Sequence, residues 1–459
     1  MAPYSFWPAI FVGLSGLYIC VARCPSNFKA AWLGFAFSLG YFGFSLSWVG
    51  NALLVEDNPY WWVWPIAISG LPFVLSCFTA AFCYIYKRIC KQHNNWATYL
   101  CFCVCIMAAE YARGHLFTGF PWNLYGYTWI SVLPIAQTAS LWNIYLLTAI
   151  TVIWAVFPAY IIGTHDKKPI KALLSAFILI GFVSSYMFGL NRLNSSNNDS
   201  AALNQTEFVV IQPNIKQSEK WKPEKRSDNF VHIVEQSMYN EASKASDKKS
   251  YIVIWPETTI SQDVLNTKWT MGEIKRMLQS YPAPAFLVTG ALRYVPESES
   301  FYNSLLVLNS DAEIIGTYDK SHLVPFGEYM PLSNIIDIAP IVGFSGFEKG
   351  TRSNIIDVPN GINIGALICY EIIFPKFTKF SANNKPDILI NVTNDAWYGV
   401  SAGPYQHLVQ TQFRAIESGL PVIRAANTGI SAIITPQGVI SSRMPLNKHG
   451  VIQTLDRSD

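Results

Sequence analysis

The sequence predicts a helical membrane domain with several spans, followed by a soluble α/β domain. The chain has 459 residues, of which 51% are hydrophobic and only 14% are charged, whereas about a quarter of the residues of a soluble protein are charged. Apolar runs divided by short polar patches continue to about Leu190, and from Asn191 onward strand-like and helical stretches alternate. The formal net charge of +3 is too small to indicate a nucleic-acid partner.

Residues 1–190 predict a membrane domain of about six helices, because about 20 apolar residues cross a bilayer. The fourth stretch has the weakest signal, since it ends at Glu110 and Arg113, which we expect to pair with each other or to meet a lipid headgroup. The first stretch lacks the basic leading region of a cleaved signal peptide. The predicted spans are Tyr4–Ala22, Ala30–Val55, Pro59–Tyr86, Trp96–Ala112, Val132–Ile162 and Ala172–Leu190.

Basic residues in the short loops predict the orientation, because cytoplasmic loops carry an excess of Lys and Arg. The second loop has only acidic residues, Glu56 and Asp57. Loops one, three and five should therefore lie inside, and everything after Leu190 outside. The basic loop residues are Arg23 and Lys29, then Lys87, Arg88 and Lys91, then Lys167, Lys168 and Lys171.

The second half predicts an Asn/Ser-rich linker over residues 191–204 and one α/β domain over residues 205–459. Short runs of Val, Ile and Leu alternate with helical patterns, as in a sheet buried on both faces. The expected strands are Glu207–Gln212, Tyr251–Trp255, Ala285–Thr289, Ile362–Ile368 and Ile388–Val392, and the expected helices are Pro223–Ala245, Lys268–Ser280 and Gln406–Ser418.

Two charged residues near predicted strand ends are candidates for catalysis. Pro256 ends an apolar strand, and Glu257 follows it, so its carboxylate could point into a cleft. Lys320 lies among apolar residues before a Pro–Phe–Gly turn and could supply a fixed positive charge for an oxyanion. Taken singly, each pattern favours an ordinary surface residue, and His322 favours a hydrogen-bonded structural histidine.

Cys369 is the third candidate, because it is the only cysteine of the second half and follows an apolar strand directly. A helix starting there would lower the pKa of the thiol and raise its thiolate fraction. Taken alone, a buried core cysteine is the simpler interpretation. The three candidates together supply what thiol catalysis needs, which is a nucleophile, a base and a donor for the oxyanion.

Several long motifs carry a resemblance to a known family. They are IWPETTI, YDKSHLVPFGEYMP, ICYEI, NDAWYGVSAGPYQH with FRAIESGLPVIRAANTGIS, and AAEYARGHLFTGFPWNLYGY in the membrane half. The order Glu257, Lys320, Cys369 resembles the triad of the nitrilase superfamily, and the whole chain resembles the apolipoprotein N-acyltransferases, a membrane-embedded branch of it. The resemblance implies a nitrilase-like αββα sandwich as the catalytic domain, on the periplasmic side of the bacterial inner membrane.

The resemblance also implies a ping-pong reaction and roles for residues. Cys369 would take an acyl chain from a phospholipid as a thioester and pass it to the N-terminal amine of a diacylglyceryl apolipoprotein. Glu257 would be the base and acid, and Lys320 would stabilise the oxyanion. Glu328, Tyr370 and Glu371 would support the site, and Trp221 and Trp397 would contact substrate. The stretch Pro331–Phe347 could be an arm on the bilayer or an ordinary core segment.

Three alternatives remain open at this stage. A membrane-tethered nitrilase or amidase would hydrolyse a small soluble substrate with the same three residues. A serine hydrolase would use Ser401, since Gly399 to Gly403 fits G-x-S-x-G, but that motif needs a strand directly before the serine. An inactive scaffold would explain why spans that usually begin and end the family's chains have no counterpart here. The sequence has no metal-ligand cluster and no phosphate-binding glycine loop, so we expect no metal and no cofactor.

Overall fold

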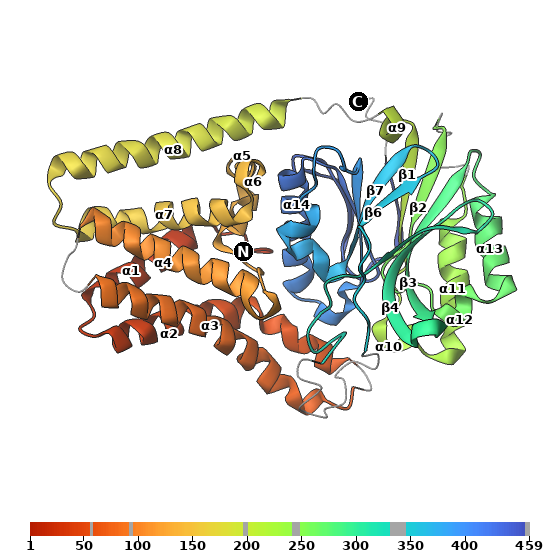
Figure 1. Cartoon of the computed structure of the whole chain (residues 1–459), viewed down its shortest axis with the longest axis horizontal. Coiled ribbons are helices and arrows are strands. Elements are labelled where there is room, and N and C mark those ends of the chain that lie inside the picture. Colours follow the sequence, from red (N-terminus) through yellow and green to blue (C-terminus); the bar gives the residue numbers. More distant parts are fainter. Residues whose placement is uncertain (56–57, 91–94, 196–200, 241–247, 331–345, 455–459) are drawn as a thin grey trace. The chain divides into compact units, whose positions relative to one another are not determined.

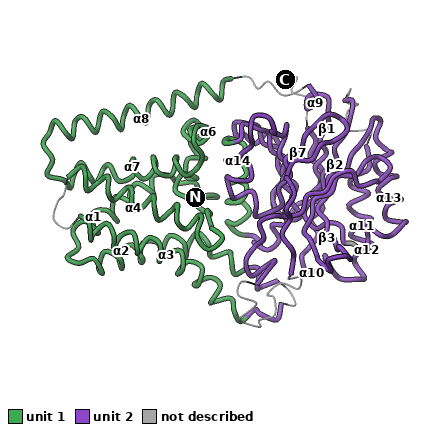
Figure 2. The backbone as a smooth tube through the Cα atoms, in the orientation of Figure 1, with its two compact units in different colours: residues 1–50, 62–196, 401–417 green, residues 51–61, 197–400, 418–459 purple. Residues whose placement is uncertain are grey.

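The computed structural model describes the chain except for residues 56–57, 91–94, 196–200, 241–247, 331–345 and 455–459. The described residues form two compact units (Figure 2). The helical unit contains residues 1–50, 62–196 and 401–417, and the sheet unit contains residues 51–61, 197–400 and 418–459. The chain passes from the helical unit to the sheet unit near residue 196, close to the predicted linker. Two short segments, 51–61 and 401–417, belong to the opposite unit from the one that the predicted boundary gives them. The predicted arm lies almost wholly in 331–345, outside the described residues.

The helical unit contains helices that are suited to a membrane. Four helices of the described chain are long and apolar enough to cross one, and a fifth counts if the bent pair α2 and η1 forms one span. The first helix, α1, is apolar but has only 16 residues, so the count of six spans stays a prediction. The long helices are α1 (Pro8–Arg23), α2 (Asn27–Ser45), α3 (Trp64–Ile89), α4 (Trp96–His115), α7 (Ile144–Gly163) and α8 (Lys168–Asn194), and η1 is Ser47–Leu54 (Figure 1).

The fifth predicted span, Val132–Ile162, is wrong as a single helix. The structure divides it into α5 (Leu133–Ala136), α6 (Ala139–Trp142) and α7. The break lies at Asn143, whose φ of 106° is outside the helical range and whose side chain accepts a hydrogen bond from the Tyr145 amide at 2.9 Å. Asn143 therefore caps a new helix, which the apolar composition of the stretch conceals.

Glu110 and Arg113 pair with each other inside the helical unit. Both side chains are buried, and the guanidinium donates to the two carboxylate oxygens at 2.8 and 2.7 Å. Its remaining nitrogen donates to the carbonyls of Phe120 and Trp122 at 2.8 and 2.9 Å. Because this pair satisfies itself with protein atoms, the alternative that these residues meet a lipid headgroup is not needed.

Helix α14 (Gly403–Ser418) belongs largely to the helical unit, although it follows the sheet strands in sequence. Val409, Phe413 and Ile416 join a buried cluster with apolar residues of α7 and of the segment before it. One turn earlier, the Gln406 side-chain oxygen accepts hydrogen bonds from the indoles of Trp48 and Trp122 at 3.1 and 2.8 Å. The chain that leaves the sheet unit after Val400 is therefore held by membrane helices.

The sheet unit contains two six-stranded sheets. All five predicted strands are present, because runs of β-branched residues buried on both faces form the parallel centres of the sheets. The first sheet has the order β12-β1-β2-β3-β4-β5: Gly450–Gln453, Thr206–Gln212, Ser250–Ile254, Ala285–Val295, Ser300–Leu308 and Ile314–Asp319. The second has the order β11-β10-β9-β8-β7-β6: Ile440–Met444, Ser431–Ile434, Val422–Ala426, Ile388–Thr393, Ile362–Ile368 and Ile355–Val358.

The two sheets pack face to face, and helices cover the outer face of the first. Alternate residues of β2 point to the two sides, with Ile252 and Ile254 in the core between the sheets and Val253 against the helices. The covering helices are α11 (Pro223–Ser237) and α13 (Lys268–Leu278), both expected from the sequence. The predicted extension of α11 to Ala245 is not supported, since the helix ends at Ser237. The parallel strands β7 and β8 end at one edge of the second sheet, so the segments after them lie together. The segment after β2 of the first sheet meets them, since the Asn394 amide donates to the Glu257 carboxylate.

Candidate active site

Cys369 lies in a strained turn at the end of β7. Its φ is 48°, a left-handed conformation that costs a residue other than glycine about 1–3 kcal/mol. The side chain is only 8% exposed. A single 3-10 turn, η6 (Cys369–Ile373), follows instead of a long helix. The turn lets the thiol leave the line of the strand, as the sequence suggested.

The expected lowering of the Cys369 pKa is wrong. Burial and, after it, the negative charge of Glu257 raise the pKa of the thiol to about 12, although the positive charge of Lys320 and a hydrogen bond with Thr393 oppose the shift. The short η6 turn has little dipole with which to offset burial. The thiol is therefore protonated at rest and needs a base at the moment of attack.

Glu257 is held in place at the end of β2. Its two carboxylate oxygens accept hydrogen bonds from the Asn303 side chain at 2.8 Å and from the Asn394 backbone amide at 2.9 Å. Gly290 of β3 permits this arrangement, because a Cβ at that position would lie only 2.5 Å from the Glu257 Cα. Glu257 is only 5% exposed, so its hydrogen-bond partners fix the direction of the carboxylate.

Lys320 lies between two carboxylates. Its Nζ is 2.8 Å from Glu328 Oε1 and 3.6 Å from Glu257 Oε1, and the residue is 1% exposed. Burial lowers the pKa of this ammonium, but the charges of Glu328 and Glu257 raise it more, so the net pKa lies above the usual range. Lys320 is therefore a permanent positive charge that is unsuited to accept a proton.

Asn303 of β4 is a site residue that the sequence analysis missed. Its Nδ2 donates both to Glu257 Oε1 at 2.8 Å and to Glu328 Oε1 at 2.9 Å. Its backbone carbonyl accepts from the Lys320 amide at 2.8 Å. One asparagine thus ties the base, the lysine and the supporting acid together. Nothing in the local run FYNSLLVL distinguishes it from a polar residue on an ordinary strand.

Glu371 organises the segment around the nucleophile. Its carboxylate accepts from the backbone amides of Ser321, His322 and Ile368 at 2.8, 3.2 and 2.9 Å, and from the Tyr318 hydroxyl at 2.7 Å. Burial nevertheless raises its pKa. The carboxylate thereby joins the Cys369 turn to the segment after Lys320, and its supporting role in the reaction stays a prediction.

Tyr370 belongs to an aromatic cluster with His322, Phe374 and Phe377. The His322 ring lies 5.9 Å from the Tyr370 ring and 4.2 Å from that of Phe374. Burial, together with the positive charges of Lys376, Lys320 and Lys349, lowers the pKa of His322 from 6.5 to about 4. The histidine is therefore neutral and packed, as the structural interpretation predicts.

This histidine predicts a stability that depends on pH. Between pH 6.5 and 4 the unfolded chain binds a proton at His322 and the folded chain does not, so stability should fall as the pH drops, by at most about 3 kcal/mol. A His322→Phe variant should show a flatter melting temperature from pH 7 to pH 4. His449→Phe, at an exposed position, is the matched control. Equal slopes in His322→Phe and wild type would contradict the assignment.

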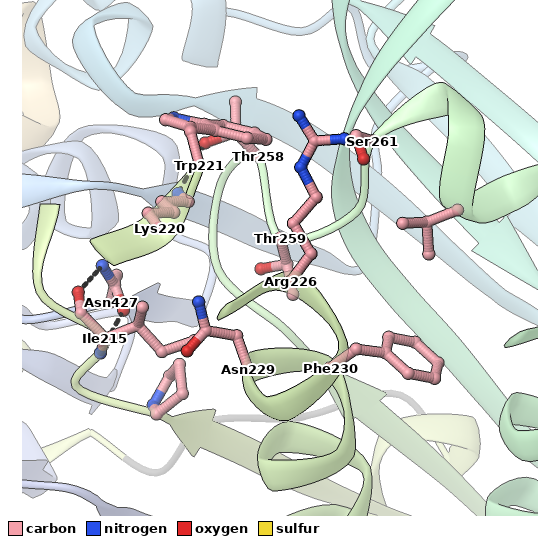
Figure 3. A pocket seen from close by; sticks show the side chains of 12 residues that line it. Ile215, Lys220, Trp221, Arg226, Asn229, Phe230, Thr258, Thr259, Ser261 and Asn427 are labelled. Atoms are coloured by element: carbon pink, nitrogen blue, oxygen red, sulfur yellow. Dashed lines mark hydrogen bonds between the residues drawn. The ribbon is translucent and has the colours of Figure 1, made fainter. Parts of the chain in front are cut away.

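Trp221 and Trp397 are both half-buried. Trp221 follows α10 (Gln217–Lys220) and borders a small cavity of about 40 Å³, with Lys220 and Thr258 beside it (Figure 3). The cavity has room for only a few water molecules, and neither Cys369 nor Lys320 lines it, so it is not a place for an acyl chain. Trp397 lies in the 3-10 turn η8 (Asp395–Tyr398). The substrate contacts of both tryptophans stay predictions.

Comparison with known proteins adds two kinds of match. The family model for the apolipoprotein N-acyltransferase N-terminal domain matches residues 1–157, and the carbon-nitrogen hydrolase model matches residues 209–459. The apolipoprotein N-acyltransferase of Rhodopseudomonas palustris is 33% identical over 99% of this chain and 86% of its own. The chain belongs to the apolipoprotein N-acyltransferase family. The relatives from Sinorhizobium medicae and Sinorhizobium fredii, with the same name, are 34% and 35% identical with the same coverage.

Membership of this family confirms the resemblance and the predicted fold class, a helical membrane domain with a nitrilase-like α/β domain. It also identifies the protein as an acyltransferase of the membrane. The individual residue roles are not tested by it. Within the described ranges, no three Cys, His, Asp or Glu side chains are grouped so that they could hold a metal ion, and the expectation of no metal stays a prediction.

The serine-hydrolase alternative lacks its required geometry. No strand ends directly before Ser401, since η8 and Gly399 intervene after β8. The Ser401 hydroxyl instead accepts a hydrogen bond from the Gly403 amide at 3.1 Å, at the start of α14. Ser401 therefore accepts a hydrogen bond at the start of α14 and does not lie in the strand-to-helix turn that a serine nucleophile needs.

Proposed function

We propose that the protein transfers an acyl chain from a phospholipid to the N-terminal amine of a diacylglyceryl lipoprotein, through a thioester at Cys369. The observation that carries the proposal is the grouping of Cys369 with Glu257 and Lys320 in one buried site. Family membership supports the acyl transfer and, through the name of the relatives, the lipoprotein acceptor. The several membrane helices support a lipid donor, because a soluble amidase that is tethered to the membrane would need only one helix as its anchor.

In the first half-reaction, Cys369 Sγ attacks the ester carbonyl of the phospholipid while Glu257 takes the thiol proton. Lys320 stabilises the oxyanion of the tetrahedral intermediate. The carbon–oxygen bond then breaks, Glu257 gives the proton to the leaving alkoxide, and lysophospholipid departs. The raised pKa of the thiol supports this order, because a preformed thiolate would be scarce.

In the second half-reaction, the lipoprotein amine attacks the thioester and Glu257 accepts a proton from the attacking nitrogen. The carbon–sulfur bond breaks, and the proton returns to the cysteine, so the enzyme is restored and an amide is formed. Lys320 has the same task as before. Its ion pairs with Glu328 and Glu257 support a charge that persists through both steps.

The proposal places the protein in the bacterial inner membrane with the sheet unit on the periplasmic side. The basic last turns of α1 and α3 and the basic start of α8 support this orientation, because they lie at one end of the helical unit (Figure 1). Lys87 donates to the Ala22 carbonyl at 2.8 Å, which joins the ends of α3 and α1. Lys171 donates to the Thr164 carbonyl at 2.8 Å in the turn between α7 and α8. Basic turns at one end are typical of the cytoplasmic side.

The test is the intact mass of the full chain in micelles after incubation with phosphatidylethanolamine. The wild type should gain one acyl mass that hydroxylamine removes, and Cys369→Ala should gain none. Cys77→Ala, which removes an exposed cysteine of the helical unit, should keep the adduct. A diacylglyceryl-cysteine peptide should then discharge it, and the same peptide with an acetylated amine should not.

Two outcomes would count against the proposal. An adduct that persists in Cys369→Ala would assign the acyl group to another residue. A wild type that forms no adduct with phospholipid, yet hydrolyses short soluble amides, would favour the tethered-amidase alternative.

A further inference from the structure

A buried lysine that the reaction does not use lies against the turn that carries Glu257. Lys220 is the last residue of α10 and is 9% exposed. Its Nζ donates to the Glu257 carbonyl at 3.0 Å and to Thr258 Oγ1 at 2.7 Å. Figure 3 shows the lysine beside Thr258 and Trp221. The two hydrogen bonds hold Glu257 and Thr258, the residues whose backbone determines the direction of the Glu257 carboxylate.

The turn held by Lys220 needs such support. Thr258 has a φ of 50°, which is an outlier for a β-branched residue. The amides of Thr259 and Ile260 both donate to the Gly290 carbonyl, at 2.9 and 3.2 Å. These bonds secure the far side of the turn, whereas Lys220 secures Glu257 and Thr258 themselves.

A second residue of α10 supports the other side of the base. Gln217 Oε1 accepts a hydrogen bond from the Asn394 side chain at 2.8 Å. The Asn394 backbone amide in turn donates to Glu257 Oε2 at 2.9 Å. The single short helix α10 therefore holds the main chain of Glu257 directly and its carboxylate through Asn394.

The energetics indicate that Lys220 is not present for stability. Burying an ammonium is costly, and its two acceptors are a carbonyl and a hydroxyl rather than a carboxylate. Burial lowers the pKa of Lys220 to about 8 in spite of the opposing negative charge of Glu257. An apolar side chain of the same length would fill this space at a smaller cost. Such an apolar side chain could not donate the two hydrogen bonds that fix the Glu257–Thr258 turn.

We propose that Lys220 is a positioning residue for the general base, whose ammonium fixes the Glu257–Thr258 turn so that the Glu257 carboxylate stays directed at the Cys369 thiol. This rests on the proposed function of Glu257. It also gives Trp221, the next residue along the chain, a physical connection to the base, since the Lys220 ammonium lies 5.5 Å from the Trp221 ring centre.

The test compares Lys220→Met, Lys220→Arg and Lys216→Met in the full chain, by the rate of thioester formation with phosphatidylethanolamine. Lys216 precedes the same helix, and its side chain is 76% exposed. Lys220→Met should react about tenfold to a hundredfold more slowly at saturating lipid, with the half-saturating lipid concentration and the melting temperature unchanged. Lys220→Arg should recover part of the rate, and Lys216→Met should match the wild type.

A folded Lys220→Met that reacts at the wild-type rate would overturn the proposal. So would a loss confined to the half-saturating lipid concentration, because that would assign Lys220 to substrate binding. If Lys220→Met does not fold, Thr258→Ala removes the hydroxyl partner instead, and a folded Thr258→Ala at the wild-type rate would overturn it. A wild type without any thioester would refute the proposed function itself, which separates the two failures.

Discussion

A glutamine in place of Glu257 is expected to slow the acylation of Cys369 by about a hundredfold to ten-thousandfold, the usual contribution of a positioned general base. Burial raises the pKa of the Cys369 thiol to about 12, so about one thiol in ten thousand is ionised at pH 8. Attack without a base would depend on that small fraction. The measurement is the rate at which the acyl adduct grows in the intact mass, with phospholipid in excess.

The dependence on pH identifies the reason for the loss. Without the base only preformed thiolate reacts, so the rate of Glu257→Gln should rise about tenfold per pH unit below the thiol pKa. The lost negative charge also lowers that pKa, because Glu257 raises it in the wild type, and this offsets part of the defect. Glu297→Gln, at an exposed position, should react normally. Acylation of Glu257→Gln within about threefold of wild type would exclude Glu257 as the base.

Two of the three catalytic candidates have a local signal in the sequence. Glu257 follows β2 after Trp255 and Pro256, and Cys369 directly follows β7, so each lies at the carboxyl end of an apolar strand with a parallel neighbour. Lys320 follows β5, which runs antiparallel to its neighbour β4. The strand pattern therefore did not predict that Lys320 lies at this site, and only the family resemblance did. The buried strands themselves were predicted for the same reason, since continuous runs of Val, Ile and Leu suit sheets covered on both faces.

Residues that reach the site from distant segments had no such signal. Asn303 lies 46 positions from Glu257 and Lys220 lies 37 positions before it, and each resembles an ordinary polar residue in its own segment. Such residues are selected by tertiary contacts, which periodicity and composition do not record.

Three expectations failed for identifiable reasons. The pKa of Cys369 depends on burial on all sides, whereas the sequence showed only a possible helix start. The predicted span Val132–Ile162 is apolar throughout, but a positive φ at Asn143 interrupts it. Composition also assigned α14 to the soluble half, although Phe413 and Ile416 pack with membrane helices. An amphipathic helix does not specify which unit covers its apolar face.

Replacing Arg424 by methionine is expected to lower the free energy of unfolding by about 3–5 kcal/mol, because it leaves a buried carboxylate without its partner. Arg424 lies 2.6 Å from Asp395, and both side chains are fully buried. The guanidinium also donates to Asn391 Oδ1 at 2.6 Å and to the Ile430 carbonyl at 3.2 Å. Asp395 packs closely against the Gly429 backbone, where an added Cβ would lie 2.3 Å from its Oδ2. The midpoint of thermal unfolding in micelles should fall by on the order of 10 °C.

Two further variants separate charge from packing. Arg424→Met combined with Asp395→Asn should recover at least about 1 kcal/mol, because the second change removes the unpaired charge. Lys275→Met breaks the exposed pair of Lys275 with Asp311, 46% and 62% exposed, and should cost less than about 1 kcal/mol. A double variant as unstable as the sum of its single changes would assign the loss to packing instead.

The same pair should also influence catalysis below the unfolding temperature. Asp395 begins the η8 turn and accepts a hydrogen bond from the Thr393 hydroxyl at 3.1 Å, and Thr393 is also the residue whose hydrogen bond lowers the pKa of Cys369. When Arg424 is lost, the uncompensated carboxylate should hold the single Thr393 hydroxyl hydrogen more strongly and leave it less available to the thiol. Arg424→Met should therefore acylate more slowly than Lys275→Met at a temperature where both are folded. Equal rates would mean that the Arg424–Asp395 pair stabilises the sheet unit without acting on the nucleophile.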